Sequence, residues 1–155
     1  MADTGLRVIC PGMEEGGKFP LRHTGRGEDR SPEFLLPDLL PTVKALAVVL
    51  EDLSHPIPHF PHWVVWNLPA GDRIPGGIPP GAEVPGMKGV RQGIAYGFHR
   101  YAGPKPPEGR QHTYQFTIFA LDTRLRLGPM AGRRAFLKRA AGHILQRGSL
   151  TGVFE

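Results

Sequence analysis

Glycine and proline limit what this chain can fold into. The sequence contains 21 glycines and 17 prolines in 155 residues, and they fall between short apolar runs rather than in one tract. Proline has no backbone donor and fits poorly inside a helix or a central strand, and glycine favours turns. We therefore expect many short strands joined by turns. The length predicts a single domain over residues 1–155, with room for a hydrophobic core.

Two apolar runs flank a turn-rich segment near the middle of the chain. Residues 45–50 and 62–68 are rich in β-branched and aromatic side chains, whereas residues 51–61 are dense in proline, acid and histidine. Short apolar runs closed by turn residues are typical of buried strands. The sequence therefore predicts a strand, a loop and a second strand, with Asp52 just after the first strand and His62 at the start of the second.

The clearest strand is predicted at residues 112–121, where the residues alternate in character. One face carries His112, Tyr114, Phe116, Ile118 and Ala120, and the other carries Thr113, Gln115, Thr117, Phe119 and Leu121. Both faces are apolar at the far end, which indicates a central strand covered on both sides. Further extended segments are expected at residues 6–10, 34–36, 95–101 and 150–154. Residues 69–93 are expected to form a long irregular surface loop anchored by Ile74, Ile78, Val84, Met87 and Val90.

A change to helical spacing occurs between residues 130 and 147. Apolar residues recur at one-turn spacing, and arginine and lysine take the opposite side. This pattern predicts an amphipathic helix. Gly148 stands where a left-handed residue would end it.

Charge and cysteine content indicate which partners and which cellular compartment to expect. The formal net charge is +5, but no aromatic residues are interleaved with the basic ones, so we expect a soluble chain that does not bind nucleic acid. The lone Cys10 excludes an intrachain disulfide and fits a reducing compartment. The first ten residues lack the pattern of a signal peptide, and no apolar run approaches the ~20 residues of a membrane span. We expect a cytoplasmic location.

The polar residues at the predicted strand ends leave two interpretations open. Asp52, His62 and His112 would line a small cup for a phosphate or carboxylate if they met at one rim of the sheet, with Asp52 favouring the charged form of His62. The pattern alone favours the simpler interpretation of three unrelated surface residues.

Metal and catalytic sites are not expected. His55, His59 and His62 are interrupted by prolines, which prevents a helical zinc site. A triad through Ser54 lacks the G-x-S-x-G turn, and no phosphate-binding glycine motif is present. We therefore predict no enzyme activity, no catalytic residue, no metal and no cofactor.

Several motifs, taken together and in order, resemble the phosphatidylethanolamine-binding protein family, also called the Raf kinase inhibitor protein family. Residues 52–56 are similar to its D-P-D-A-P motif, residues 62–67 to H-W-V-V-x-N, and residues 112–114 to H-R-Y. Gly103-Pro104, Pro106-Pro107 and Ala120-Leu121-Asp122 add to the match, and the C-terminal residues look like the short bacterial and archaeal branch. The departures are Leu53, Ser54, His55 and Thr113.

The resemblance implies a mainly β fold with a large central antiparallel sheet, a smaller sheet packed on it and few helices, one of them near the C-terminus. It also implies an anion-binding pocket lined by Asp52, His62, His112 and Tyr114, with Pro106 at its rim. It makes the bond between His55 and Pro56 a candidate for a cis peptide. The implied function is non-enzymatic binding of a phosphate or phospholipid head group. The alternative is a modulator of a kinase or protease that acts through the loop at residues 69–93 and the basic helix rather than through the pocket. A homodimer is compatible with the resemblance.

Overall fold

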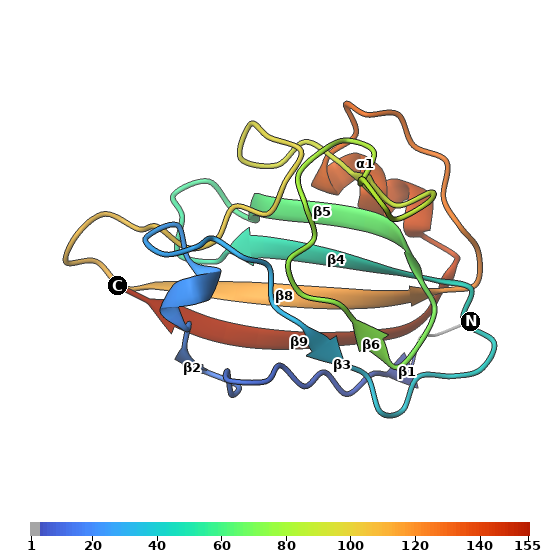
Figure 1. Ribbon diagram of the computed structural model, residues 1–155, viewed down its shortest axis with the longest axis horizontal. Helices are drawn as coiled ribbons and strands as arrows, with labels where there is room; N and C mark the ends of the chain where they lie inside the picture. Colours follow the sequence, from blue (N-terminus) through green and yellow to red (C-terminus); the bar gives the residue numbers. More distant parts are fainter. Residues whose placement is uncertain (1–3) are drawn as a thin grey trace.

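The computed structural model describes residues 4–155, and a large β-sheet runs through its centre (Figure 1). Its four long strands are β4 (Ala45–Asp52), β5 (Phe60–Pro69), β8 (His112–Leu121) and β9 (Ile144–Phe154). They lie in the order β9-β8-β4-β5, and each neighbouring pair is antiparallel. The predicted strands at residues 45–50, 62–68 and 112–121 are therefore confirmed, and β8 is a central strand.

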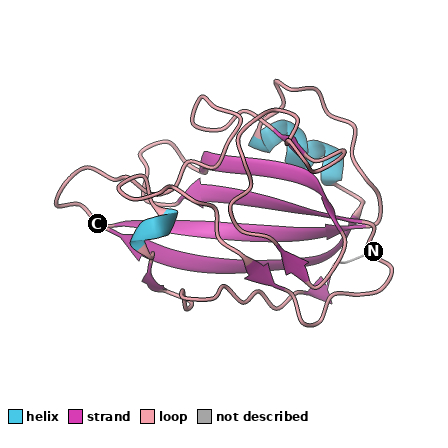
Figure 2. Ribbon diagram, viewed as in Figure 1, coloured by secondary structure: helices cyan, strands magenta, loops and turns pink. Residues whose placement is uncertain are grey.

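Short strands complete the sheets. β7 (Arg91–Gln92) pairs with β5, and β1 (Thr4–Gly5) and β2 (Gly17–Lys18) run parallel to β9, which makes the large sheet mixed rather than purely antiparallel. β3 (Phe34–Leu35) and β6 (Arg73–Ile74) form a separate two-stranded sheet. Figure 2 shows that helix is confined to two short pieces in the described chain. The mainly β fold with a large and a small sheet is thus confirmed.

Both faces of the large sheet are buried. One face packs against the N-terminal segment, the small sheet and the long loop after β6, and its cluster includes Leu50, Trp63, Phe116, Phe19 and Phe34. The other face packs against α1 (Arg133–Ala140) through a cluster that includes Val64, Trp66, Phe119 and Phe136. Each fully buried side chain of this size contributes roughly 1.5–3 kcal/mol. The predicted alternation of β8 is confirmed, because Tyr114 and Phe116 join the first cluster and Phe119 and Leu121 the second.

The C-terminal helix is shorter than predicted. α1 ends at Ala140, and Gly142 takes a left-handed conformation with φ 84° before β9 begins at Ile144. The residues after Gly142 pair with β8 instead, because strand pairing satisfies their backbone groups and buries alternate side chains. The prediction that Gly148 ends a helix was wrong. It lies inside β9, where a Cβ atom would collide with the backbone oxygen of Leu6.

Three other predicted segments also differ in detail. Residues 6–10 make only isolated bridges, such as Ile9 with Leu35, rather than a strand. Residues 95–101 begin with a tight turn closed by Ala95 and Phe98 instead of extended chain. The loop at residues 69–93 contains β6 and β7, and its apolar anchors are buried or packed against the core as predicted. No cis peptide bond occurs in residues 4–155, so the expected cis bond before Pro56 was wrong.

Candidate functional site

A pocket of about 470 Å³ lies at the end of the large sheet where β4 ends and β5 and β8 begin. Figure 1 shows this end of the sheet on the left. The chain brings together there all five residues singled out from the sequence. Its lining consists of Asp52, Ser54, His55, Pro56, His62, Tyr96, Lys105, Pro106, Pro107, Arg110, His112 and Tyr114.

The Asp52 carboxylate organises one wall of the pocket. It is 3% exposed, and its Oδ2 accepts a hydrogen bond of 2.8 Å from Nδ1 of His112. Its Oδ1 accepts the backbone N–H of Ser54 at 2.8 Å, which fixes the start of the following loop. Antiparallel pairing of β4 with β8 places Asp52 opposite Tyr114, so His112 lies within reach on the same face. A protonated His112 would therefore form an ion pair with Asp52.

His62 faces the pocket because β5 contains a bulge. Leu50 pairs with Trp63 and Glu51 with Pro61, which leaves His62 as an extra residue on β5. Strict alternation would put His62 on the face covered by α1, but a bulge turns two successive side chains to the same side. His62 consequently lies beside Tyr114, with their ring centroids 5.5 Å apart.

Asp52 was expected to favour the charged form of His62, but within residues 4–155 the two side chains have other hydrogen-bond partners. Nδ1 of His62 lies 2.7 Å from the carbonyl oxygen of Ala102, while the backbone N–H of Ala102 donates to the carbonyl of His62. A carbonyl can only accept, so Nδ1 carries the proton and neutral His62 has its lone pair on Nε2. Asp52 orients His112 instead, because that histidine is the closer partner across the strand pair.

The expectation that His62 leans towards its charged form was also wrong. Burial lowers the pKa of His62, and the Ala102 hydrogen bond and the negative charge of Asp52 oppose this only in part. At neutral pH His62 is therefore uncharged and offers an acceptor at Nε2, for which the part of the chain that the structure describes supplies no partner. It suits a ligand group that donates a hydrogen bond, such as an amine.

Aromatic rings form the wall around His62. The centroid of the His62 ring lies 4.7 Å from that of Tyr96 and 5.8 Å from that of Phe60. The His55 ring stacks on Phe60 with a centroid distance of 3.9 Å. Tyr96 is 47% exposed and has φ 53°, which is uncommon for an aromatic residue. Burial, together with the charge of Asp52, raises the pKa of Tyr114 well above its ordinary value, so its phenol stays neutral.

Two cations stand at the mouth of the pocket. Lys105 and Arg110 line it, and both are exposed. They supply positive charge where Thr113 replaces the arginine of the family motif. Thr113 instead donates its backbone N–H to Oγ of Ser54 at 2.9 Å, which ties β8 to the loop that follows β4.

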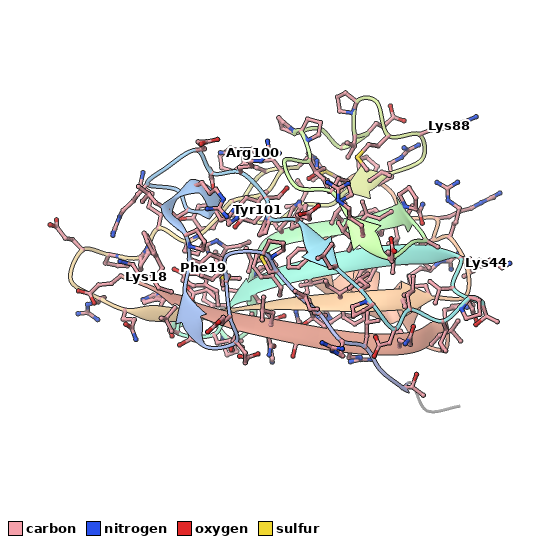
Figure 3. All side chains as sticks on the ribbon, turned by 60° about the horizontal axis from the view of Figure 1, so that its bottom comes forward. Lys18, Phe19, Lys44, Lys88, Arg100 and Tyr101 are labelled. Carbon is pink, nitrogen blue, oxygen red and sulfur yellow. The ribbon has the colours of Figure 1, made fainter. Side chains whose placement is uncertain are left out.

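The rim segment at residues 101–110 is held by the N-terminal part of the chain. The backbone N–H of Gly103 donates to Asp29 at 2.7 Å, and Arg26 donates to the carbonyl of Pro106. The Tyr101 hydroxyl donates to the carbonyl of His23 at 2.6 Å. In Figure 3, Tyr101 and Phe19 lie on the same side of the large sheet, and both rings stack on Phe116. These contacts fix Ala102, and through it His62.

The lining also contains residues that were not singled out from the sequence as site residues, among them Tyr96, Lys105, Arg110 and His55. Tyr96, Lys105 and Arg110 come from loops whose folding depends on distant contacts, so no local pattern marks them. His55 was considered only as a metal ligand or as a departure from the motif. The one usable signal was that Lys105 and Arg110 belong to the same short segment as Pro106 and Pro107.

The three histidines considered as a zinc site do not come together around one point. His55 stacks on Phe60, His59 contacts Glu51 at 2.8 Å, and His62 contacts Ala102. Within residues 4–155, no three histidine, cysteine or acidic side chains are placed to hold a metal ion. No helix in that range is long and apolar enough to cross a membrane.

Comparison with known proteins places the chain in a family. The family model described as "Phosphatidylethanolamine-binding protein" matches residues 11–155, so the chain belongs to that family. It is 38% identical over 139 residues to the UPF0098 protein PH1269 of Pyrococcus horikoshii, covering 88% of this chain and 70% of the relative. A UPF0098 protein of Archaeoglobus fulgidus is 38% identical over 148 residues, and the match covers 96% of this chain but only 50% of the length of that relative.

A solved structure shows the same fold. The crystal structure of Escherichia coli YbcL, described as a new member of the mammalian PEBP family, superimposes with a TM-score of 0.86. The two chains are 23% identical, and the match covers 98% of this chain and 99% of the other.

Proposed function

We propose that the pocket binds a small phosphate-bearing head group that also carries an amine, without chemical conversion. The observation that carries this proposal is the separation of two kinds of partner within one pocket. Lys105, Arg110 and His112 are donors for phosphate oxygens, whereas neutral His62 is an acceptor set in an aromatic wall. Arginine and lysine form charge-assisted hydrogen bonds with phosphate, and an amine is stabilised both by an acceptor and by aromatic faces.

Each residue then has a defined role. Asp52 fixes His112 with Nδ1 towards the carboxylate, so protonated His112 donates from Nε2 to the ligand. Lys105 and Arg110 attract the anion and contact it at the mouth. Tyr114 and the Pro106–Pro107 turn shape the pocket, and Tyr96 covers His62.

The absence of catalysis is part of the proposal. The hydroxyl of Ser54 accepts a backbone N–H from Thr113, and among the described residues no histidine is hydrogen-bonded to it. A serine nucleophile needs an adjacent general base. We expect no release of inorganic phosphate from phosphoethanolamine, and a colorimetric phosphate assay checks this.

Titration calorimetry with phosphoethanolamine and with inorganic phosphate tests the binding. We expect the double variant Lys105→Ala/Arg110→Ala to bind phosphoethanolamine about tenfold more weakly, because two phosphate contacts are lost. Arg134→Ala/Lys138→Ala, with the same charge loss on exposed positions of α1, should bind within twofold of the parent. Equal losses in both double variants would refute a role for the pocket cations. Equal affinity for the two ligands would refute an amine subsite.

Substitution tests His112 separately. His112→Ala should bind phosphoethanolamine more weakly than the parent, because it lacks the ring that Asp52 orients in the pocket. An affinity for phosphoethanolamine equal to that of the parent would contradict this role.

The kinase or protease partner, the homodimer and the cytoplasmic location stay predictions. Partner binding that survives both His62→Ala and His112→Ala would place that interaction outside the pocket.

A further inference from the structure

A second hollow, of about 620 Å³, lies at the opposite end of the large sheet from the pocket. Its walls are formed by residues 88–91 and 124–128, and Asn67 of β5 also lines it. In Figure 1 the segment at residues 124–128 follows the arrowhead of β8 at the right, and Figure 3 labels Lys88 at the upper right. The function proposed above does not use this hollow.

Among residues 4–155, those that line the hollow include four cations and no acidic side chain. Lys88, Arg91, Arg124 and Arg126 all contribute to it. Arg91 pairs with Glu83 at 3.2 Å, whereas the ion pairs found within residues 4–155 include none to the other three side chains. A concave surface lined by one sign of charge concentrates the potential and attracts the opposite charge.

The two walls are held in place by side-chain contacts. The side-chain amide of Asn67 donates to the carbonyl of Leu125 at 2.9 Å and accepts its backbone N–H at 2.7 Å. Arg124 donates to the carbonyl of Lys88 at 3.4 Å across the hollow. Gly89 has φ 81°, and a Cβ atom there would collide with the Arg124 guanidinium. The two segments that carry the cations are therefore held in fixed positions.

The spacing of two arginines indicates the shape of the ligand. Arg124 and Arg126 are exposed, and Leu125 between them is buried. The two arginines therefore lie on the solvent side of this segment, two positions apart. Alternate side chains of any extended peptide have the same spacing. An extended chain with an acid at every second position would match both arginines.

We propose that this hollow binds an extended acidic peptide segment of a partner protein, with aspartate or glutamate at alternate positions. Arginine pairs with carboxylates in a bidentate geometry, and Lys88 adds charge from the opposite wall. The lining contains no aromatic side chain on which a nucleic-acid base could stack, which favours a peptide over single-stranded nucleic acid.

Fluorescence anisotropy with two labelled peptides tests the proposal. One peptide alternates four glutamates with four serines, and the other has the same composition with the four glutamates in one block. We expect the alternating peptide to bind more tightly, and Lys88→Ala/Arg126→Ala to weaken it by about five- to tenfold. Neither substituted side chain takes part in the contacts between the walls. The matched control Arg134→Ala/Lys138→Ala should stay within twofold of the parent.

Three outcomes would overturn the proposal. Equal affinity for the two peptides would show that only total charge matters. Equal loss in the two double variants would show that binding does not occur in this hollow. Tighter binding of an oligothymidylate that is lost with Lys88→Ala/Arg126→Ala would assign the hollow to nucleic acid. A doubly substituted His62→Ala/His112→Ala chain should still bind the alternating peptide, which separates this result from the proposed head-group binding.

Discussion

Asn67 offers the sharpest test of how this fold holds its loops. The residue lies at a register shift in β5, has φ 62°, and makes two side-chain hydrogen bonds to the backbone of the buried Leu125. Asn67→Ala removes both bonds, at roughly 1 kcal/mol each, and adds about 1 kcal/mol because alanine is strained in the left-handed region. The expected loss in the free energy of unfolding is therefore about 3 kcal/mol.

Differential scanning calorimetry measures this loss. For a chain of this size, 1 kcal/mol corresponds to roughly 2–4 °C in Tm, so Asn67→Ala should melt about 6–12 °C below the parent. Asn67→Gly loses the same two hydrogen bonds without the backbone strain, so its Tm should lie between those of the parent and Asn67→Ala. A Tm for Asn67→Ala within 1 °C of the parent would refute the assigned role of the hydrogen bonds. A glycine variant less stable than the alanine variant would refute the strain.

Three further predictions concern the pocket and the core. His62 is buried, and its pKa in the folded chain is lowered from 6.5. The stability that neutral His62 contributes is therefore fully present above the unfolded pKa. It is lost as the pH falls through 6.5 towards the lower pKa of the folded state. The Tm of the parent should therefore fall more steeply between pH 7.5 and 5 than that of His62→Gln, and parallel curves would contradict this. Tyr96→Asn should raise the free energy of unfolding by about 1 kcal/mol, because asparagine before Gly97 suits a two-residue turn with positive φ. The same change should weaken phosphoethanolamine binding. A Tm below that of the parent would contradict backbone strain at Tyr96. Burial raises the pKa of Cys10 to about 11, so a disulfide reagent at pH 8 should react with it only after unfolding in guanidinium, and rapid reaction of the native chain would disprove its burial.

The strands could be predicted because their signals are local. Polar and apolar residues alternate at the start of residues 112–121. The apolar runs around residues 45–50 and 62–68 end at prolines and polar residues, so the turn residues mark the same strands as the apolar pattern does. The helix was overextended because Ile144 and Leu145 continue its one-turn spacing. Spacing alone does not show that a left-handed Gly142 and pairing with β8 give these residues another partner.

The residues of the pocket were easier to predict than their contacts. The positions of Asp52, His62 and His112 at strand ends allowed them to converge, but this pattern alone favoured three unrelated surface residues. The family resemblance implied the shared pocket, and the three residues do line one pocket. Which histidine Asp52 contacts depends on strand order and on the bulge at His62, both set by long-range pairing. The cations Lys105 and Arg110 reach the pocket only because the N-terminal segment holds their loop, a contact between residues far apart in the sequence.

A crystal of the chain grown with phosphoethanolamine near pH 6 tests the central claim most directly. We predict density for the phosphate within about 3.2 Å of Nε2 of His112 and of the Lys105 and Arg110 donors, with the amine towards Nε2 of His62 beneath Tyr96. Phosphoethanolamine bound elsewhere while this pocket contains only water, or bound with its amine against Lys105 and Arg110, would contradict the account.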